Sequence, residues 1–155
     1  MLLFFIEHLY GLGDLRIAFP LLFVVSCIIL IKNRDQVGGW LKKDHAFFIG
    51  FAWALFWRYS KPDIDTGTEH ITDMFFIANY AKGVTLPPPN LWLAPFVFDC
   101  YYAFQHYAAA LLSRIFAIGP GYAYNLAFAL IFGYASGLVW ETTRYHTRSK
   151  TYAYV

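Results

Sequence analysis

The chain alternates between long apolar runs and shorter polar segments. The apolar runs occupy residues 15–31, 46–57, 96–116 and 122–140. About 20 apolar residues cross a bilayer as a helix, and the last run is well formed for this. Lipid leaves only helices and closed barrels as spanning structures, and none of the runs alternates as a strand does. The pattern therefore predicts an all-α fold, a polytopic transmembrane helical bundle of about four spans.

The polar segments divide the chain into three expected regions. Residues 1–45 would hold N-terminal hydrophobic helices and a cytoplasmic loop, residues 46–140 the main membrane region, and residues 141–155 a polar tail. Basic residues in short loops mark the cytoplasmic side of a membrane, which puts residues 32–45 inside and the polar stretch 58–95 outside. The same count puts the tail outside although most of its charges are basic, so the side of the tail stays open.

The amino-acid composition is typical of an integral membrane protein. Of the 155 residues, 59% are hydrophobic and 14% are charged, against roughly 45–50% and 25% in soluble domains. The mean hydropathy is +0.44. The net charge of +2 is too small for binding a nucleic-acid backbone. These values exclude an ordinary soluble domain, a disordered chain and a nucleic-acid binder, and they make the lipid bilayer the expected partner.

The outer loop contains the pattern of one further helix. Thr66 and Glu69 fit a capping box, in which each side chain accepts the other residue's backbone N–H. The helix would then run over about residues 67–82. Its two faces differ, with Ile71, Met74, Phe75 and Ala78 on the apolar one and Glu69, Asp73 and Tyr80 on the polar one. We therefore expect an amphipathic interfacial helix whose polar face looks into an outward cavity.

Glu69 and Asp73 lie one helical turn apart and are the candidate catalytic and metal-binding residues. Two carboxylates at this spacing can hold a divalent cation, or one can act as a base while the other orients it. The alternative interpretation makes Glu69 only a helix cap and Asp73 only a solvated helix residue.

Other polar residues near the apolar runs are candidates for binding. Arg58 and Lys61 could clamp a phosphate, or they could anchor the chain at the interface by snorkelling. His106 could carry protons, bind a ligand or satisfy helix packing, because ionisable residues inside a membrane are costly. The nearby tyrosines fit an interfacial aromatic belt: Tyr101, Tyr102 and Tyr107.

Five short motifs follow one another along the chain. They are RYSKPDI at 58–64, TEHITD at 68–73, PPPNLWLA at 87–94, YYAFQH at 101–106 and AYNLA at 123–127. Their order resembles the YYY membrane protein family, named for its tyrosine triplet, over roughly residues 44–131. That family is polytopic and similar to the C-type glycosyltransferases, which use lipid-phosphate-linked sugars. The resemblance implies a plasma-membrane protein of a bacterium or archaeon, with the loop 58–95 facing outside.

The resemblance also implies roles for single residues. Glu69 and Asp73 match the family's acidic pair, so they would act as catalytic base or metal ligands, with a divalent cation (Mg or Mn) as cofactor. Arg58 becomes the candidate for the lipid phosphate. The residues expected to line the donor or acceptor cavity are Trp92, Tyr101, Tyr102 and His106. The sequence departs from the family pattern at several positions, among them His70, Asn90, Leu91, Ala103 and Gln105.

Three functions stay open. The first is a fragment or reduced relative of a C-type glycosyltransferase-like protein that transfers sugar from a polyprenyl-phosphate donor. The second is a non-catalytic small subunit, bound to other membrane subunits or to the rest of a longer chain. The small residues at 108–110 and 133–137 predict close helix packing in either case. The third is a proton or ion pathway that uses Glu69, Asp99 and His106.

Overall fold

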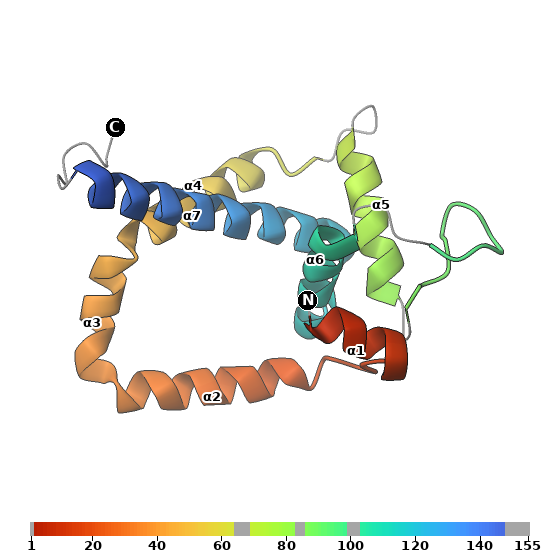
Figure 1. Cartoon of the computed structure of the whole chain (residues 1–155), viewed down its shortest axis with the longest axis horizontal. Helices are drawn as coiled ribbons and strands as arrows, with labels where there is room; N and C mark the ends of the chain where they lie inside the picture. Colours follow the sequence, from red (N-terminus) through yellow and green to blue (C-terminus); the bar gives the residue numbers. More distant parts are fainter. Residues whose placement is uncertain (1, 64–68, 83–85, 99–102, 148–155) are drawn as a thin grey trace. The chain divides into compact units, whose positions relative to one another are not determined.

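The computed structural model describes residues 2–63, 69–82, 86–98 and 103–147 (Figure 1). Within these ranges the chain forms seven helices and no sheet, which confirms the all-α class. The helices are α1 (Leu2–Tyr10), α2 (Ala18–Lys32), α3 (Arg34–Lys43), α4 (His45–Ser60), α5 (Glu69–Lys82), α6 (Ala103–Phe116) and α7 (Pro120–Thr147).

The four expected spans all contain a helix, but the lengths differ from expectation. Among the described helices, α7 is the one that is both long and apolar enough to cross a membrane, with 28 residues. The helix α2 is apolar but has 15 residues, or roughly 22 Å at 1.5 Å per residue. One candidate span is therefore shown, with one shorter apolar helix, and the fuller bundle of about four spans stays a prediction.

The third expected span, residues 96–116, is wrong in its first part. The helix α6 is described from Ala103 onward, and residues 96–98 belong to a loop. There Val97 forms an isolated antiparallel bridge with Pro89, and the Phe98 N–H donates to the Pro88 carbonyl over 2.7 Å. Apolar character alone does not distinguish such a loop from the start of a helix.

Internal contacts divide the chain into two compact units. The first unit consists of Met1–Val25 and Asp63–Tyr124, and the second consists of Ser26–Pro62 and Asn125–Val155. The expected division at residues 45 and 140 follows the hydropathy pattern rather than these contacts, and it stays a prediction.

Aromatic rings from α1, α5 and α6 form the core of the first unit. The centroid of the Tyr107 ring lies 5.1 Å from that of the Phe4 ring and 5.9 Å from that of the Tyr80 ring. The Phe98 ring from the loop closes the cluster at 5.5 Å from Tyr80. All four of these side chains are buried. Buried edge-to-face rings of this kind stabilise beyond the area that they bury.

The helix α5 buries a different face from the expected one. Its buried residues are Phe76, Ile77, Asn79 and Tyr80. Tyr80, which the sequence places on the polar face, is only 2% exposed because it packs against Phe98 and Tyr107. That assignment is therefore wrong. The expected capping residue Thr66 lies outside the described residues.

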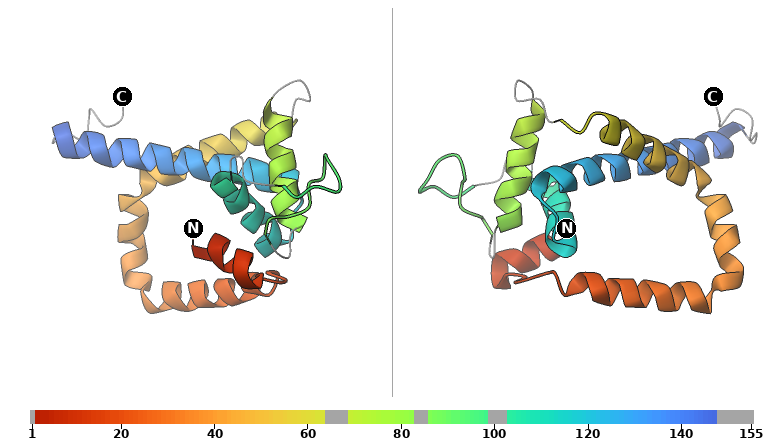
Figure 2. Two further views of the ribbon diagram at one scale, coloured as in Figure 1. Left: turned by 45° about the vertical axis from the view of Figure 1, so that its right-hand side comes forward. Right: turned by 180° about the vertical axis from the view of Figure 1, so that it is seen from behind.

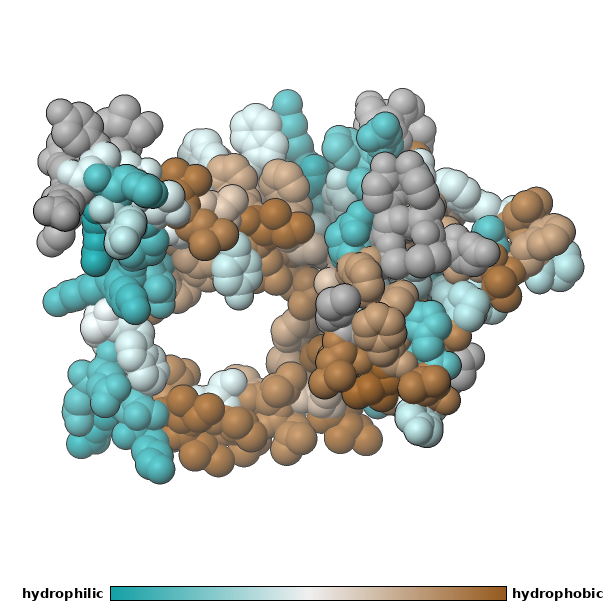
Figure 3. Space-filling model, viewed as in Figure 1, coloured by the Kyte–Doolittle hydropathy of each residue, from teal (hydrophilic) through white to brown (hydrophobic). Residues whose placement is uncertain are grey.

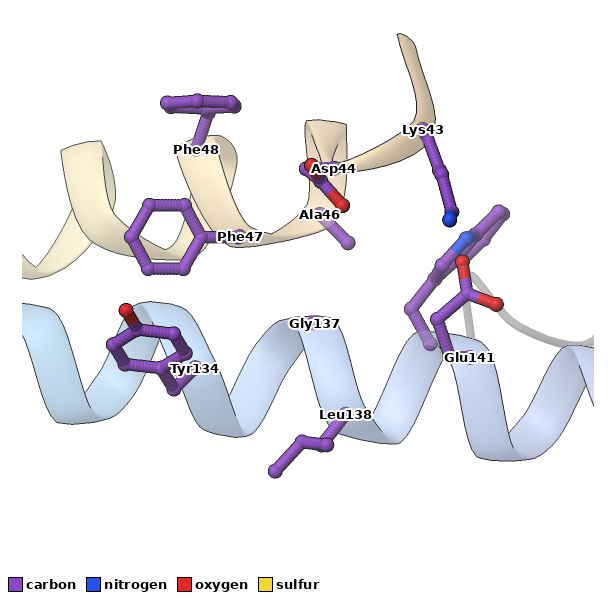
Figure 4. Close-up of a pocket in the computed structure, with 10 residues that line it drawn as sticks. Lys43, Asp44, Ala46, Phe47, Phe48, Tyr134, Gly137, Leu138 and Glu141 are labelled. Atoms are coloured by element: carbon purple, nitrogen blue, oxygen red, sulfur yellow. The ribbon is translucent and has the colours of Figure 1, made fainter. Parts of the chain in front are cut away.

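The helices α4 and α7 of the second unit approach closely through small residues. A Cβ atom added to Gly50 would lie 2.4 Å from the Ser136 Oγ, and one added to Gly133 would lie 3.0 Å from Phe47. Figure 4 shows Phe47 of α4 facing Tyr134 of α7, and their ring centroids are 5.0 Å apart. The close packing predicted for residues 133–137 is confirmed here, and it follows the use of small residues between membrane helices.

The helix α2 presents an apolar surface on all sides. None of its residues is buried, although almost every side chain is hydrophobic. The space-filling view shows the resulting apolar band along α2 (Figure 3). An apolar surface of this extent is unfavourable in water, so α2 is built for contact with lipid or with other apolar helices.

The close approach of α4 and α7 makes Gly50→Ala a destabilising change. The added methyl group meets the Ser136 side chain, so we expect a loss of about 1–3 kcal/mol from overpacking and a lower melting temperature in detergent. Gly38 lies in α3 with nothing within 4 Å of an added Cβ. Gly38→Ala is therefore the matched control, and it should keep or raise the melting temperature. Equal melting of the Gly50→Ala and native proteins would contradict this packing.

Candidate functional site

Asp73 of α5 and His106 of α6 form a pair across the first unit. The His106 Nε2 lies 3.0 Å from the Asp73 Oδ1. The imidazole is almost completely buried, with 8% of its side chain exposed, whereas the Asp73 side chain is 38% exposed. An ionised carboxylate can only accept hydrogen bonds, so with ionised Asp73 the Nε2 carries the proton. The Asp73 carboxylate is thus partly accessible to solvent, and the buried His106 imidazole hydrogen-bonds to one of its oxygens.

An aromatic ring fixes the orientation of the imidazole. Phe76, one turn after Asp73 along α5, meets the His106 ring edge to face, with centroids 5.0 Å apart and planes at 81°. Phe76 in turn lies 5.2 Å from the Phe98 ring. Because both rings are buried, the imidazole has little freedom to turn away from Asp73. Such a supported pair suits a group that must hold one geometry.

The loop between α5 and α6 is tied to the same helix. The Trp92 ring lies 5.0 Å from the Phe75 ring and 6.0 Å from the Phe76 ring. The Asn79 side-chain oxygen accepts the Leu91 N–H over 2.8 Å. Sequence reasoning missed Asn79, although a lone amide among apolar positions of a helix was a usable signal. Trp92 therefore lies beside the helix that carries Asp73, and its role in a binding site stays a prediction.

Glu69 lies in the first turn of α5 and is exposed. It shares the helix with Asp73 at the expected spacing of one turn. The next residue, His70, has its Nδ1 2.9 Å from the Tyr124 hydroxyl. Among the described residues, no group of three or more histidine, cysteine, aspartate and glutamate side chains could hold a metal ion. Two carboxylates are thus what this helix can offer to a cation.

Arg58 and Lys61 belong to the second unit, and each contacts a different neighbour. The Arg58 Nε donates to the Asn125 Oδ1 over 2.6 Å, and its guanidinium lies over the Phe128 ring at 5.8 Å. The Lys61 ammonium lies over the Trp57 ring at 5.5 Å. The bond from Arg58 to Asn125 joins the first and last of the five sequence motifs, a pairing that sequence reasoning missed.

Two of the expected binding residues, Tyr101 and Tyr102, lie outside the described residues. Each of the two units has a cavity lined by described residues. One of about 420 Å³ lies along α4 and α7 and is lined in part by Phe47 and Glu141. Another, of about 530 Å³, opens at the C-terminal ends of α5 and α6. None of the expected site residues lines either cavity.

Residues 2–154 match the protein family described as "Uncharacterized membrane protein (DUF2298)". The chain belongs to this family. Comparison with curated proteins and with solved structures gave no match. Membership in DUF2298 confirms a membrane protein family, which is the coarser part of the expected resemblance. The match carries neither the tyrosine-triplet name nor a glycosyltransferase name.

The DUF2298 chain also contains a buried ion pair that the sequence did not reveal. The Glu7 carboxylate is fully buried and accepts hydrogen bonds from the Tyr107 hydroxyl and the Arg114 guanidinium. A second nitrogen of Arg114 donates to the Gly13 carbonyl over 2.9 Å. Tyr107 is thus part of a buried network rather than of the expected aromatic belt. The network joins α1 to α6 across about a hundred residues of sequence.

Glu7→Gln tests the importance of this network. The change leaves the Arg114 charge buried without its anion, which typically costs about 3–5 kcal/mol. We expect a large drop in the melting temperature, measured by circular dichroism in detergent. Glu141→Gln is the control, because Glu141 and Arg144 form an exposed pair at 3.9 Å of the kind worth about 0–1 kcal/mol. Similar melting temperatures for the two variants would refute a central role for Glu7.

Proposed function

We propose that this DUF2298 chain carries the acidic part of a membrane transferase site, similar to that of C-type glycosyltransferases. The site would move a sugar from a polyprenyl-phosphate donor to an acceptor hydroxyl at the outer face of the membrane. The observation that carries the proposal is the Asp73–His106 pair, with its 3.0 Å contact, buried imidazole and accessible carboxylate. A general base needs this combination of a reachable oxygen and a fixed orientation.

In the proposed reaction Asp73 removes the proton from the acceptor hydroxyl. The acceptor oxygen then attacks the anomeric carbon of the sugar, and the bond from that carbon to the phosphate oxygen breaks. The phosphate leaves with the electron pair and stays attached to its lipid. His106 is a positioning residue, because its Nε2 bond holds the Asp73 carboxylate toward the acceptor.

A divalent cation fits this site only with help from the substrate. Glu69 and Asp73 would supply protein oxygen ligands, one helical turn apart on α5. Magnesium sites are commonly built from one or two carboxylates together with substrate phosphates. When bound, such a cation neutralises charge on the leaving phosphate.

The remaining expected residues complete the proposal. Arg58, with Lys61 near it in sequence, would bind the donor phosphate, because a guanidinium matches phosphate oxygens in pairs. Trp92 is 53% exposed, which leaves its ring surface available to the lipid chain of the donor, where the donor cavity would meet the membrane. Tyr101 and Tyr102 would line the donor or acceptor cavity.

The proposed setting is a plasma membrane with the loop 58–95 outside. The helices α2, α4 and α6 would lie in the bilayer with α7, in keeping with the about four spans predicted from hydropathy. The exposed apolar surface of α2 supports this setting, since lipid would cover it.

Asp73→Asn tests the catalytic role directly. In proteoliposomes with short-chain polyprenyl-phosphate hexoses, we expect polyprenyl-phosphate release to fall by about 100- to 10,000-fold. His106→Gln should give a smaller loss. Asp44→Asn is the control, because the Asp44 side chain makes no capping bond at the start of α4. Full release by the Asp73→Asn protein would disprove the catalytic role.

Removal of divalent cations tests the second part of the proposal. We expect a chelator to abolish release and added Mg²⁺ or Mn²⁺ to restore it. Glu69→Gln should raise the cation concentration that gives half-maximal release, since one charged ligand is lost. Unchanged release in the chelator would remove the cation from the mechanism while leaving Asp73 as base.

A non-catalytic subunit is the second candidate function. The observation in its favour is the unburied apolar surface of α2, which other membrane helices could cover. In this case partners would co-purify in mild detergent, and the Asp73→Asn change would leave the complex intact. Absence of both release activity and stable partners would argue against both functions.

A further inference from the structure

The loop between α5 and α6 exposes large apolar side chains at its tip. Five of them are between 40% and 62% exposed: Leu91, Trp92, Leu93, Phe96 and Val97. The sequence from Gly83 to Phe98 contains no charged residue and no histidine. In the views of Figures 1 and 2 this green loop projects away from α5.

Several backbone N–H groups of the loop are bonded within the loop itself. The Asn90 N–H donates to the Phe96 carbonyl over 2.9 Å, and the Phe96 N–H donates to the Leu93 carbonyl over 3.0 Å. The Phe98 N–H donates to the Pro88 carbonyl. Four prolines carry no N–H at all: Pro87, Pro88, Pro89 and Pro95. The loop thus forms a closed turn in which these N–H groups need no water.

Two asparagine side chains complete this closure. The Asn90 Oδ1 accepts the N–H groups of Trp92 and Leu93 over 2.9 and 3.2 Å. The Asn79 Oδ1 of α5 accepts the N–H of Leu91 over 2.8 Å. Three successive N–H groups at the tip are therefore bonded to side chains of the protein, while the apolar side chains of the tip are exposed.

We infer that residues 90–97 are a lipid-inserting loop, with their apolar side chains among the acyl chains at the membrane interface. Irregular backbone exposed to lipid does not enter the hydrocarbon core, so the main chain of the loop stays at the level of the headgroups while its side chains reach the acyl chains. The N–H groups that are already bonded within the protein lower the cost of leaving bulk water. A protein partner would instead meet a polar rim around an apolar centre, and the tip offers no charged group for one. Tryptophan is also the residue enriched where lipid meets water.

Insertion of the loop would determine how deeply α5 lies at the membrane surface. Trp92 packs on Phe75, and Asn79 holds Leu91, so the tip and the helix move together. Asp73 lies on the same helix and would then be kept near the membrane surface. The inference rests on the loop alone and holds whether or not Asp73 is catalytic.

Fluorescence of Trp92 tests the insertion. The other four tryptophans are replaced by phenylalanine, and the protein is placed in vesicles with lipids brominated along the acyl chain. We expect a blue-shifted emission that the brominated lipids quench strongly and aqueous iodide does not. Quenching by iodide alone would put the loop in water. Protection from both quenchers would put it under protein, and either result would overturn the inference.

A second measurement covers the case in which the four replacements prevent folding. A polarity-sensitive label is placed at Leu93→Cys in a chain whose Cys27 and Cys100 are serine. A blue-shifted label that brominated lipids quench supports insertion, and a label that emits as in water overturns it.

A charge at the tip gives the matched comparison. Leu93→Asp should remove most of the quenching of Trp92 by brominated lipids, because a carboxylate disfavours insertion. Leu93→Met keeps the apolar volume and should leave the quenching unchanged. The Leu93 side chain is 59% exposed, so neither change disturbs the core. Equal quenching in both variants would overturn the inference, whereas a loss of transferase activity alone would leave it intact.

Discussion

A polar group in an apolar setting must find its partner inside the chain, and much of this structure depends on that constraint. Burial of an unpaired charge or amide costs several kcal/mol, so such groups occur in bonded sets. Glu7 meets Tyr107 and Arg114, Asn79 meets the loop backbone, and His106 meets Asp73. Each of these contacts joins segments that are distant in sequence.

The two carboxylates of the first unit show how solvent access separates roles. Glu7 is fully buried and forms an ion pair with the Arg114 guanidinium. Its charge therefore stabilises the contact between α1 and α6. Asp73 has an imidazole on one side and keeps more than a third of its surface exposed. Chemistry with an outside molecule requires the second arrangement, which is why Asp73 rather than Glu7 is the candidate base.

Hydropathy and residue size predicted the features that depend on residues close together in the sequence. The apolar runs lie in α2, α4 and α7, and the small residues near Gly133 do meet α4. Asp73 and His106 were also recognisable as candidates, since ionisable residues stand out in an apolar sequence. Their contact was not, and neither was the pairing of Glu7 with Arg114, because periodicity reports only neighbours within one element. The packing of Tyr80 and the loop conformation of residues 96–98 were missed for the same reason, since both depend on contacts with other segments of the chain.

The exposed surface of α2 bears on the order in which the protein is made. A helix that buries no side chain against the rest of the chain does not need a buried contact with a later helix in order to form. Helices of membrane proteins commonly form first and assemble afterwards. The contact of Glu7 with Arg114 is different, because it can form only after α6 has been synthesised. The joining of α1 to α6 is therefore a late event in the making of this chain, and until then both charges lack the partner that the folded protein gives them.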